Sequence, residues 1–334
     1  MSGVSRIACA LALCALAIGG SGARAEEAMR IDVNSFPGAS NLPLWIGSEE
    51  GIFRKHGVAV VLSHPKGSVE QIKGLMEGRT PIIITALDNV VAYREKQGAI
   101  DLGDHPDLFC FMGLDSGYLT LIAAPEVKTI ADFKGKPLAV DALSTGFSFA
   151  LKEILSRAGL APDTVSYVAV GSSGERWKAL QEGKAQGALL TMPLDLFAAD
   201  KGFHALTTVA ATLGAYNATV GAAQEGWARA HKADLIAFIR GYRDAVQWLL
   251  AGEHHASVIA ILKREMPNLA DDKIERIFAL LTDPKEGFHR DLAIDPAGAK
   301  TVLDLRSRYA VPPRALPDYS TYVDNSYRQE AMRP

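Results

Sequence analysis

Short apolar runs alternate with amphipathic segments along most of the chain. The runs are rich in Val, Ile, Leu and Ala, as buried strands are, and glycines and polar residues separate them from the segments that follow. We predict strands at residues 29–33, 58–62, 82–85, 108–112, 119–123, 137–140, 165–170 and 188–191. Strands that alternate with helices indicate an α/β protein with largely parallel sheets.

Residues typical of helix starts and ends occur between these apolar runs. Asn41, Ser68 and Asp88 stand where helix N-caps are expected, and Gly51 follows the end of the first of these helices. Ser68 and Gln71 have the spacing of a capping box. Further helices are predicted at residues 147–157, 175–182, 235–249, 258–263, 272–281 and 297–309.

The alternation of strands and helices begins again near Ala131, which predicts a second α/β lobe. The Gly- and Ala-rich stretch 209–223 is predicted to be a pair of strands that returns to the first lobe. The last third of the chain is mostly helical, because apolar residues such as Leu235, Phe238 and Tyr242 recur there at helical spacing.

The N-terminus has the three parts of a secretory signal peptide. Arg6 supplies a positive charge, residues 7–20 are apolar, and Ala23 and Ala25 are small residues at a cleavage position. The apolar run is shorter than the roughly 20 residues that a membrane-spanning helix needs. We therefore predict a signal peptide over residues 1–25, cleavage after Ala25 and a periplasmic mature protein.

Composition and motifs narrow the class of function. A net charge of −3, with 22% charged and 48% hydrophobic residues, is typical of an ordinary globular protein and not of a nucleic-acid binder.

Only Cys110 lies beyond the signal segment, so no intramolecular disulfide is expected and its thiol should be buried. The adjacent His254 and His255 would point in different directions on a helix and make a poor metal pair. No HExxH, GxSxG, phosphate-loop or GxGxxG motif is present, so we predict neither an enzyme nor a cofactor.

Five stretches of the chain carry a family resemblance. They are residues 42–62 (LPLWIGSEEGIFRKHGVAVVL), 131–140 (ADFKGKPLAV), 151–160 (LKEILSRAGL), 170–193 and 322–332 (YVDNSYRQEAM). In this order they resemble the substrate-binding proteins of bacterial ABC importers, in the nitrate, taurine and sulfonate branch. The resemblance implies a two-lobed periplasmic binding protein type 2 fold, with two hinge strands between the lobes. It places residues 26–116 and 216–334 in lobe one and residues 117–215 in lobe two.

The same resemblance implies the partners. The protein is expected to be a monomer that binds a small-molecule ligand, and to dock on an ABC permease that works with ATPase subunits. Nucleic acid is not expected among its partners. The favoured ligand is a small organic anion such as a sulfonate or carboxylate, because the N-termini of helices favour anions.

The ligand cleft is expected beyond the carboxyl ends of the strands, where open α/β sheets bind their ligands. The loops that leave these ends are residues 35–41, 85–88, 114–118, 142–147, 171–175 and 191–195. The sharpest candidate contains Ser144 and Thr145, which can donate hydroxyl hydrogens, and Gly146, which lets the backbone approach an acid group closely. The other predicted ligand contacts are Ser40, Asn41, Trp45, Thr85, Asp88, Phe147 and Thr191.

Several of these residues have competing interpretations. Helix capping would also explain Ser144 or Thr145, and Trp45 fits the core as well as a ligand site. Ser172 has capping-box spacing with Glu175, so the cap is favoured over ligand contact there, and Arg176 is favoured as part of a solvated helix face.

Three alternatives to anion import remain open. A neutral heterocycle such as a thiamine precursor is the alternative ligand, and a sensing module without transport is the alternative role. Thiamine-pathway and menaquinone-pathway enzymes share the implied fold, and the former depend on a cysteine-rich stretch and an active-site histidine. The single Cys110 beyond the signal segment and the predicted export argue against an enzyme.

Overall fold

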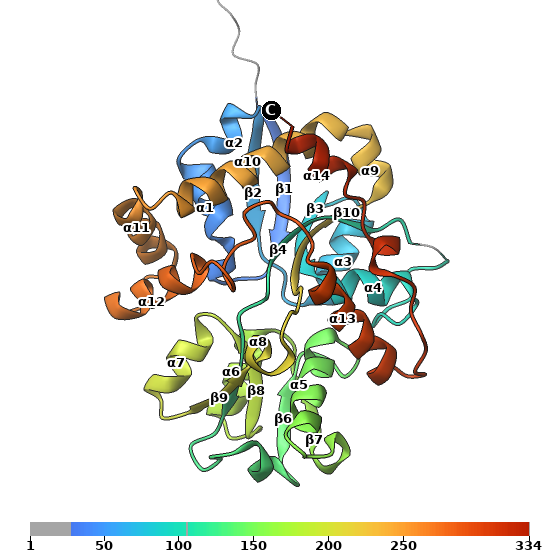
Figure 1. The fold of residues 1–334 in the computed structure, drawn as a ribbon, viewed down its shortest axis with the longest axis vertical. Helices are drawn as coiled ribbons and strands as arrows, with labels where there is room; N and C mark the ends of the chain where they lie inside the picture. Colours follow the sequence, from blue (N-terminus) through green and yellow to red (C-terminus); the bar gives the residue numbers. More distant parts are fainter. Residues whose placement is uncertain (1–27, 105, 334) are drawn as a thin grey trace, which may run out of the picture.

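The computed structural model describes residues 28–104 and 106–333, so the predicted signal segment 1–25 lies outside the described residues. Figure 1 shows two bodies, one above the other in the view. Each body is built on its own five-stranded sheet. We call the body that holds the sheet with β1 the first lobe, and the body that holds the sheet with β5 the second lobe.

The sheet of the first lobe has the strand order β2-β1-β3-β10-β4. Its strands are β1 (Met29–Ser35), β2 (Val58–Ser63), β3 (Ile82–Ala86), β4 (Phe109–Asp115) and β10 (Thr219–Ala223). Strand β1 pairs in parallel with β2 and β3, whereas β10 runs antiparallel between β3 and β4. Ile82 and Ile84 pack in one apolar cluster and Ile83 in another, so both faces of this sheet are covered.

Helices form the two covering layers of the first lobe. Apolar residues of α1 (Leu42–Glu49), α2 (Ile52–Lys55) and α10 (Lys232–Leu250) cover the face of Ile82 and Ile84. Those of α3 (Ser68–Met76), α4 (Leu87–Arg94) and α13 (Pro296–Tyr309) cover the face of Ile83. The remaining helices are α9 (Glu225–Ala230), α11 (His255–Glu265), α12 (Asp271–Leu281) and α14 (Ser326–Ala331).

The sheet of the second lobe has the strand order β7-β6-β8-β5-β9. Its strands are β5 (Leu119–Ala123), β6 (Pro137–Val140), β7 (Ser166–Ala169), β8 (Gly187–Thr191) and β9 (His204–Thr208). Strand β6 is parallel to β7 and β8, and β5 is antiparallel to β8 and β9. Its helices are α5 (Gly146–Arg157), α6 (Ser173–Gln181), α7 (Leu194–Asp200) and α8 (Val209–Leu213).

The chain crosses between the lobes twice. Residues 116–118 lead from β4 to β5, and residues 214–218 lead from α8 to β10. The two crossings lie side by side, because a Cβ atom placed on Gly117 would be 2.5 Å from the Cβ of Ala218. The two-lobed α/β fold is confirmed, while the boundaries at 116/117 and 215/216 stay a prediction.

One prediction about the strands is incomplete and another is wrong. In each sheet four strands share one direction, but the sheets are mixed because β5 and β10, which follow the two crossings, enter antiparallel. The stretch 209–223 is not a strand pair but helix α8 followed by β10. The hydroxyl of Thr208 accepts the amide of Ala211 and starts α8, and Gly214 ends it with a positive φ of 78°. Strand β9 and helix α7 were not predicted from the sequence.

Asn41 is the N-cap residue of α1 as predicted, but its side chain makes no capping hydrogen bond. The caps predicted at Ser68 and Asp88 are wrong, because these residues lie inside α3 and α4 and make no capping hydrogen bond there. Helix α3 has Gly67 as its N-cap, and Gln71 turns inward to donate to the carbonyl oxygens of Asn34 and Ile84. The N-cap pattern in the sequence therefore marks the starts of these helices but not the side-chain bonds.

The apolar core is shared between the lobes. One cluster contains Leu87 of the first lobe, Leu121 and Phe149 of the second, and Ala218 of the crossing. Cys110 is buried in the same cluster, as predicted. No helix within residues 28–104 and 106–333 is both long enough and apolar enough to cross a membrane.

Candidate functional site

A cavity of about 730 Å³ lies between the two lobes. Loops at the carboxyl ends of β1, β3, β6, β7 and β8 line it, as expected for an open α/β fold. Most of its wall is apolar, with aromatic side chains from both lobes: Trp45, Tyr93, Tyr118, Phe147 and Phe197. Of the predicted contacts, eight line it: Ser40, Trp45, Thr85, Ser144, Thr145, Gly146, Phe147 and Thr191.

The first-lobe wall presents hydroxyl, amide and imidazole groups. Nδ2 of Asn89, in the first turn of α4, donates to Oγ1 of Thr85 over 2.9 Å, which leaves the Thr85 hydroxyl hydrogen free to point elsewhere. His64 follows β2 and has its Nδ1 2.7 Å from the carbonyl oxygen of Ser35. Trp45 lines the cavity and also packs on the core of the first lobe, so its core interpretation is confirmed and its contact with a ligand stays a prediction.

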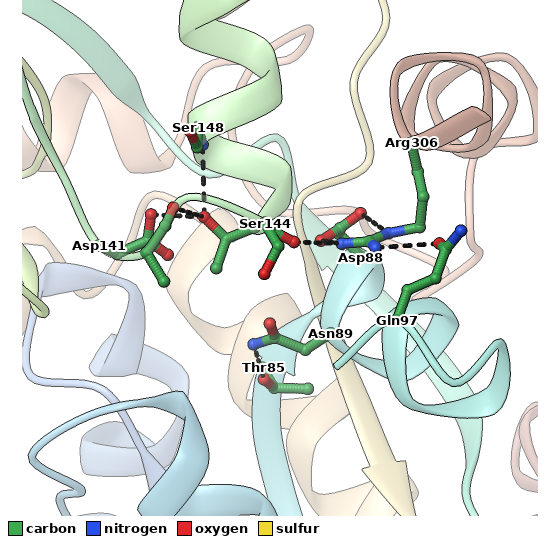
Figure 2. Close-up of polar contacts among 10 residues, drawn as sticks. Thr85, Asp88, Asn89, Gln97, Asp141, Ser144, Ser148 and Arg306 are labelled. Carbon is green, nitrogen blue, oxygen red and sulfur yellow. Dashed lines mark hydrogen bonds and ion pairs between the residues drawn. The ribbon is translucent and has the colours of Figure 1, made fainter. Parts of the chain in front are cut away.

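The second-lobe wall is centred on the start of α5, which Figure 2 shows opposite Thr85 and Asn89. Thr145 is the N-cap of α5: its Oγ1 accepts the amide of Ser148 over 3.4 Å and donates to Oδ1 of Asp141 over 2.6 Å. The hydroxyl of the exposed Ser144 makes no hydrogen bond with a described residue. The amides of Gly146 and Phe147, in the first turn, have no acceptor inside the helix.

The start of α6 forms the neighbouring part of this wall. Oγ of Ser172 accepts the amide of Glu175 over 3.4 Å, so the predicted cap is confirmed. Arg176 is not on a solvated face: its side chain is buried, and it donates to the carbonyl oxygens of Leu189 and Gly171 over 2.9 and 3.0 Å. The Arg176 side chain therefore packs beneath the loop 171–175. Helical spacing alone does not reveal this placement.

Asp141 and Arg176 are the oppositely charged groups of the second-lobe wall. Burial raises the pKa of Asp141, while the Arg176 charge and the Thr145 hydroxyl oppose that rise. Burial lowers the pKa of Arg176, and the charge of Asp141 opposes this fall. The two groups thus partly neutralise each other beside the cavity.

Two of the predicted contacts, Asn41 and Asp88, do not line the cavity. Oδ1 of Asn41 accepts the Ser35 hydroxyl over 2.6 Å, and its Nδ2 donates to the Phe36 carbonyl over 2.8 Å, which fixes the loop after β1. Asp88 accepts two hydrogen bonds of 2.6 Å from the Arg306 guanidinium of α13. Arg306 also donates to the Ser144 carbonyl of the second lobe over 2.9 Å, as Figure 2 shows.

Contacts between the lobes bridge two sides of the cavity. On one side, the start of α5 abuts the start of α4 so closely that a Cβ on Gly146 would be 2.5 Å from the Cβ of Asp88. On another, Nζ of Lys273 in α12 lies 2.7 Å from a carboxylate oxygen of Asp200 in α7. The lobes therefore contact each other on two sides of the cavity.

Sequence reasoning missed several residues of this site. His64, Asn89, Arg306, Asp115 and Tyr118 line the cavity but were not singled out. Asp115 and Tyr118 belong to a strand-end loop, 114–118, that the sequence did indicate. Within the described residues no group of three His, Cys, Asp or Glu side chains is placed to hold a metal ion.

Comparison with known protein families finds one match. A family model described as NMT1/THI5 like matches residues 39–256. The comparison with curated proteins found no match.

Solved structures show the same fold at low sequence identity. The nitrate-binding protein NrtA of Synechocystis PCC 6803 has a TM-score of 0.76 and 13% identity, covering 91% of this chain and 88% of its own. The alkanesulfonate-binding protein SsuA of Xanthomonas axonopodis, bound to MOPS, has a TM-score of 0.68 and 15% identity, with coverages of 89% and 99%. A ligand-binding component of an ABC-type import system from Staphylococcus aureus, with zinc bound, has a TM-score of 0.74 and 15% identity, with coverages of 92% and 100%.

Proposed function

The chain belongs to the NMT1/THI5-like family, and from this premise we propose that it is an exported, periplasmic solute-binding protein for an ABC importer. It captures a small organic molecule between its lobes and delivers it to the permease. The structural neighbours described as nitrate-binding, alkanesulfonate-binding and ABC-import components support this role. Its task is to bind the molecule and not to transform it.

The observation that carries the proposal is the cavity between the lobes, to which both lobes contribute polar groups. Thr85 and Asn89 come from the first lobe, and Ser144, Thr145 and Thr191 from the second. A ligand that touches both walls binds the closed arrangement better than an open one, so its binding shifts the equilibrium towards closure. A permease that recognises the closed pair of lobes would then distinguish loaded from empty protein.

We propose that the acid group of the ligand binds at the starts of α5 and α6. These helices are 12 and 9 residues long, and the amides of their first turns have no acceptor within the helix. The positive ends of the helix dipoles, together with the buried Arg176, favour a sulfonate or carboxylate. Neutral hydroxyl donors such as Ser144 add hydrogen bonds without adding charge.

The size of the cavity favours an organic acid over an inorganic ion. A volume of about 730 Å³ falls in the range of about 300–1,000 Å³ that is usual for pockets of drug-sized ligands. Aromatic residues such as Trp45 and Phe147 offer flat apolar surfaces to the body of such a molecule. We therefore propose an acid with an apolar body and not a nitrate-sized anion.

Native mass spectrometry of the freshly purified protein tests this function. The expected result is a co-purifying organic acid, or binding by members of a panel of carboxylates and sulfonates, with a decrease in the radius of gyration when they bind. Binding of a neutral heterocycle alone would overturn the anion assignment. No binding across carboxylates, sulfonates, nitrate and aminopyrimidines, with no compaction in X-ray scattering, would overturn the function.

Transport and sensing are separated by a second measurement. The loaded protein is added to a candidate permease and its ATPase from the same organism, reconstituted in liposomes. Import predicts that the loaded protein stimulates ATP hydrolysis and moves the bound molecule into the liposome. An unchanged rate, together with binding to a neighbouring sensor protein, would support the sensing role instead.

A further inference from the structure

The contacts between the lobes on the two sides of the cavity differ in burial. One lies where α13 meets α4 and α5, and we call it the α13 edge. The other lies where α12 meets α7, and we call it the α12 edge. Figure 1 shows the α13 edge on the right of the view and the α12 edge on the left, with the two chain crossings between them.

The α13 edge is built around a buried arginine. Arg306 has no exposed surface, and its Nε and Nη2 donate to the two carboxylate oxygens of Asp88 in α4, each over 2.6 Å. Nη2 also donates to the carbonyl oxygen of Ser144, just before α5, over 2.9 Å. The guanidinium lies 5.0 Å from the centre of the Phe149 ring in α5. A single side chain, shielded from water, therefore links the two lobes.

Further along α13, a second set of contacts reaches α5. Nη1 of Arg308 and the hydroxyl of Tyr309 donate to one carboxylate oxygen of Glu153, over 2.6 and 2.9 Å. The Glu153 side chain is only 6% exposed. The rings of Tyr309 and Phe149 stack with their centroids 6.2 Å apart. Separating α13 from α5 would expose both rings and leave the buried Glu153 with Arg157 alone, which makes this separation costly.

The start of α13 is attached to the second chain crossing. Oδ1 of Asn217, in that crossing, accepts the amide of Asp295, the N-cap of α13, over 2.9 Å. Gly298, in the first turn of α13, lies so close that a Cβ on it would be 2.6 Å from the backbone nitrogen of Asn217. The α13 edge is therefore continuous with the crossings.

The α12 edge has a more exposed contact. Nζ of Lys273 lies 2.8 and 2.7 Å from the two carboxylate oxygens of Asp200, whose side chain is 55% exposed. Of the buried apolar residues of the second lobe, only Met192 and Leu196 join the cluster that contains the α1 and α10 side of the first lobe. Exposed ion pairs contribute little to stability, because water solvates both groups when they separate.

We propose that the lobes open to one side. The α13 edge stays shut and acts as a third attachment beside the two crossings, and the lobes separate at the α12 edge, where the Lys273–Asp200 ion pair is the latch. The cavity then opens between α7 and residues 266–269, which line it. This inference rests on the proposed function only in that a small molecule must enter, whatever its class.

Pulsed electron paramagnetic resonance between paired spin labels tests the direction of opening. One pair of labelled cysteines replaces Lys201, which follows α7, and Ala279 of α12. The other pair replaces Lys73 of α3, on the face of the first lobe that α13 covers, and Ser156 of α5. All four positions are exposed, and the one other cysteine beyond residue 25, Cys110, is buried. Each pair therefore reports the separation of the lobes at one edge.

The protein is measured after unfolding and refolding have removed bound small molecules, and again with an excess of a sulfonate probe, 4-methylbenzenesulfonate. In the stripped protein we expect a second, longer Lys201–Ala279 distance, which the probe removes. The Lys73–Ser156 distance is expected to change by less than about 2 Å. A larger change in the Lys73–Ser156 distance would overturn the proposal. A single, unchanged distance for both pairs in the stripped protein would overturn it as well.

Asp200→Asn tests the latch, and Asp272→Asn is its matched control. Asp272 is an exposed aspartate of α12 that forms no ion pair with a described residue. Loss of the latch is expected to raise the ratio of the longer to the shorter Lys201–Ala279 distance about two- to fivefold in the stripped protein. The control is expected to leave the ratio unchanged. The same ratio in Asp200→Asn as in the wild type would overturn the latch.

The outcomes separate this inference from the proposed function. A longer Lys201–Ala279 distance that the probe does not remove, with the Lys73–Ser156 distance constant, would support the one-sided opening and contradict the sulfonate assignment. Binding of the probe with lengthening of both distances in the stripped protein would support the function and overturn the one-sided opening.

Discussion

Ser144 and Thr145 are adjacent hydroxyl residues with different tasks. The Thr145 hydroxyl is used within the protein, since it accepts the Ser148 amide and donates to Asp141. The Ser144 hydroxyl is exposed at the cavity and bonded to no described residue. Thr145 is thus the cap, and ligand contact stays a prediction for Ser144.

The two alanine variants are expected to behave differently. Thr145→Ala should lower the free energy of unfolding by about 1 kcal/mol, because it removes an N-cap. Ser144→Ala should leave stability within about 0.5 kcal/mol and weaken binding of a sulfonate probe by several-fold, about one hydrogen bond. Urea unfolding and calorimetric titration measure both effects. Unchanged probe affinity in Ser144→Ala would remove this hydroxyl from the site.

Asp115 gives a prediction about pH. Its pKa in the folded protein is raised above the ordinary value of 3.8. Above pH 3.8 the unfolded chain releases this proton while the folded chain keeps it, so stability falls as the pH rises until Asp115 ionises in the folded protein. Asp115→Asn removes this loss. Its stability relative to the wild type is therefore expected to rise from about pH 4 upwards, by at most about 1.4 kcal/mol per pH unit.

Urea unfolding of both proteins across this pH range measures the difference. Other buried acids such as Asp141 are common to the two proteins, so their contributions cancel in the comparison. Parallel stability curves would show that Asp115 has the same pKa in the folded and unfolded chains.

Residues with distant partners were the hardest to predict. Asp88 has the sequence context of an N-cap, yet its partner Arg306 lies 218 residues away. Asn41 and Arg176 likewise use their side chains to hold loops whose position depends on the tertiary fold. Local patterns predicted which loops reach the cavity, but could not show which of their side chains turn inward.

At the scale of elements, α13 is a third link between the lobes. It packs against α4 of the first lobe and α5 of the second. Arg306 pairs with Asp88, and Arg308 and Tyr309 contact Glu153 of α5 over 2.6 and 2.9 Å. This helix therefore joins the lobes in addition to the two chain crossings.

Arg306→Ala should be strongly destabilising. Both members of the Arg306–Asp88 pair are buried, so the variant leaves a carboxylate without its counter-ion at a cost of about 3–5 kcal/mol. Arg308→Ala is the matched control: its side chain is 59% exposed, and a loss of about 1 kcal/mol or less is expected. Urea unfolding compares the two. Equal losses would contradict the importance of the buried pair.

Gly146 sets how closely α5 approaches α4. Gly146→Ala should force the helices apart, because its Cβ would lie 2.5 Å from the Cβ of Asp88. We expect a larger radius of gyration in X-ray scattering and at least about tenfold weaker probe binding, since misplacement of a packed element is costly. In Gly174→Ala, at the start of α6, the nearest atom is 3.8 Å away and no such effect is expected. Identical scattering from both variants would contradict this account of closure.

Regular elements were predicted well where the apolar pattern is strong. Strand β5 was predicted to the residue because it is buried along its whole length. Strand β9 was missed because its short sequence, HALTT, is only partly buried and has no clear alternation. Helix α8 was read as strand because its small residues, VAATL, carry little helical periodicity, and the Thr208 cap determines its start.

The molecule as a whole should unfold in one step. The apolar cluster that contains Leu87, Leu121, Phe149 and Ala218 runs through both lobes and the second crossing, so neither lobe can lose its core alone. Differential scanning calorimetry is expected to give a single transition, with the calorimetric and van't Hoff enthalpies in agreement. Two resolved transitions would show that the lobes are independent.

The overall architecture was predictable because it depends on order along the chain. Repeated strand-helix alternation and the family resemblance together gave two α/β lobes. The direction of β5 and β10 was not predictable, because it depends on how the two crossings enter their sheets. The contact between the lobes through Arg306 and the Ser144 carbonyl was equally hidden, since these residues lie 162 positions apart in the sequence.

The place of β10 between β3 and β4 has a consequence for biosynthesis. A ribosome makes the chain from its N-terminus, so β3 and β4 both wait for residues 219–223, which follow the whole second lobe. Until then each of these strands has an open edge that can pair with another nascent chain. The second lobe is continuous in sequence, so all five of its strands are made before β10. The lobe that begins the protein is therefore the last to receive all its strands.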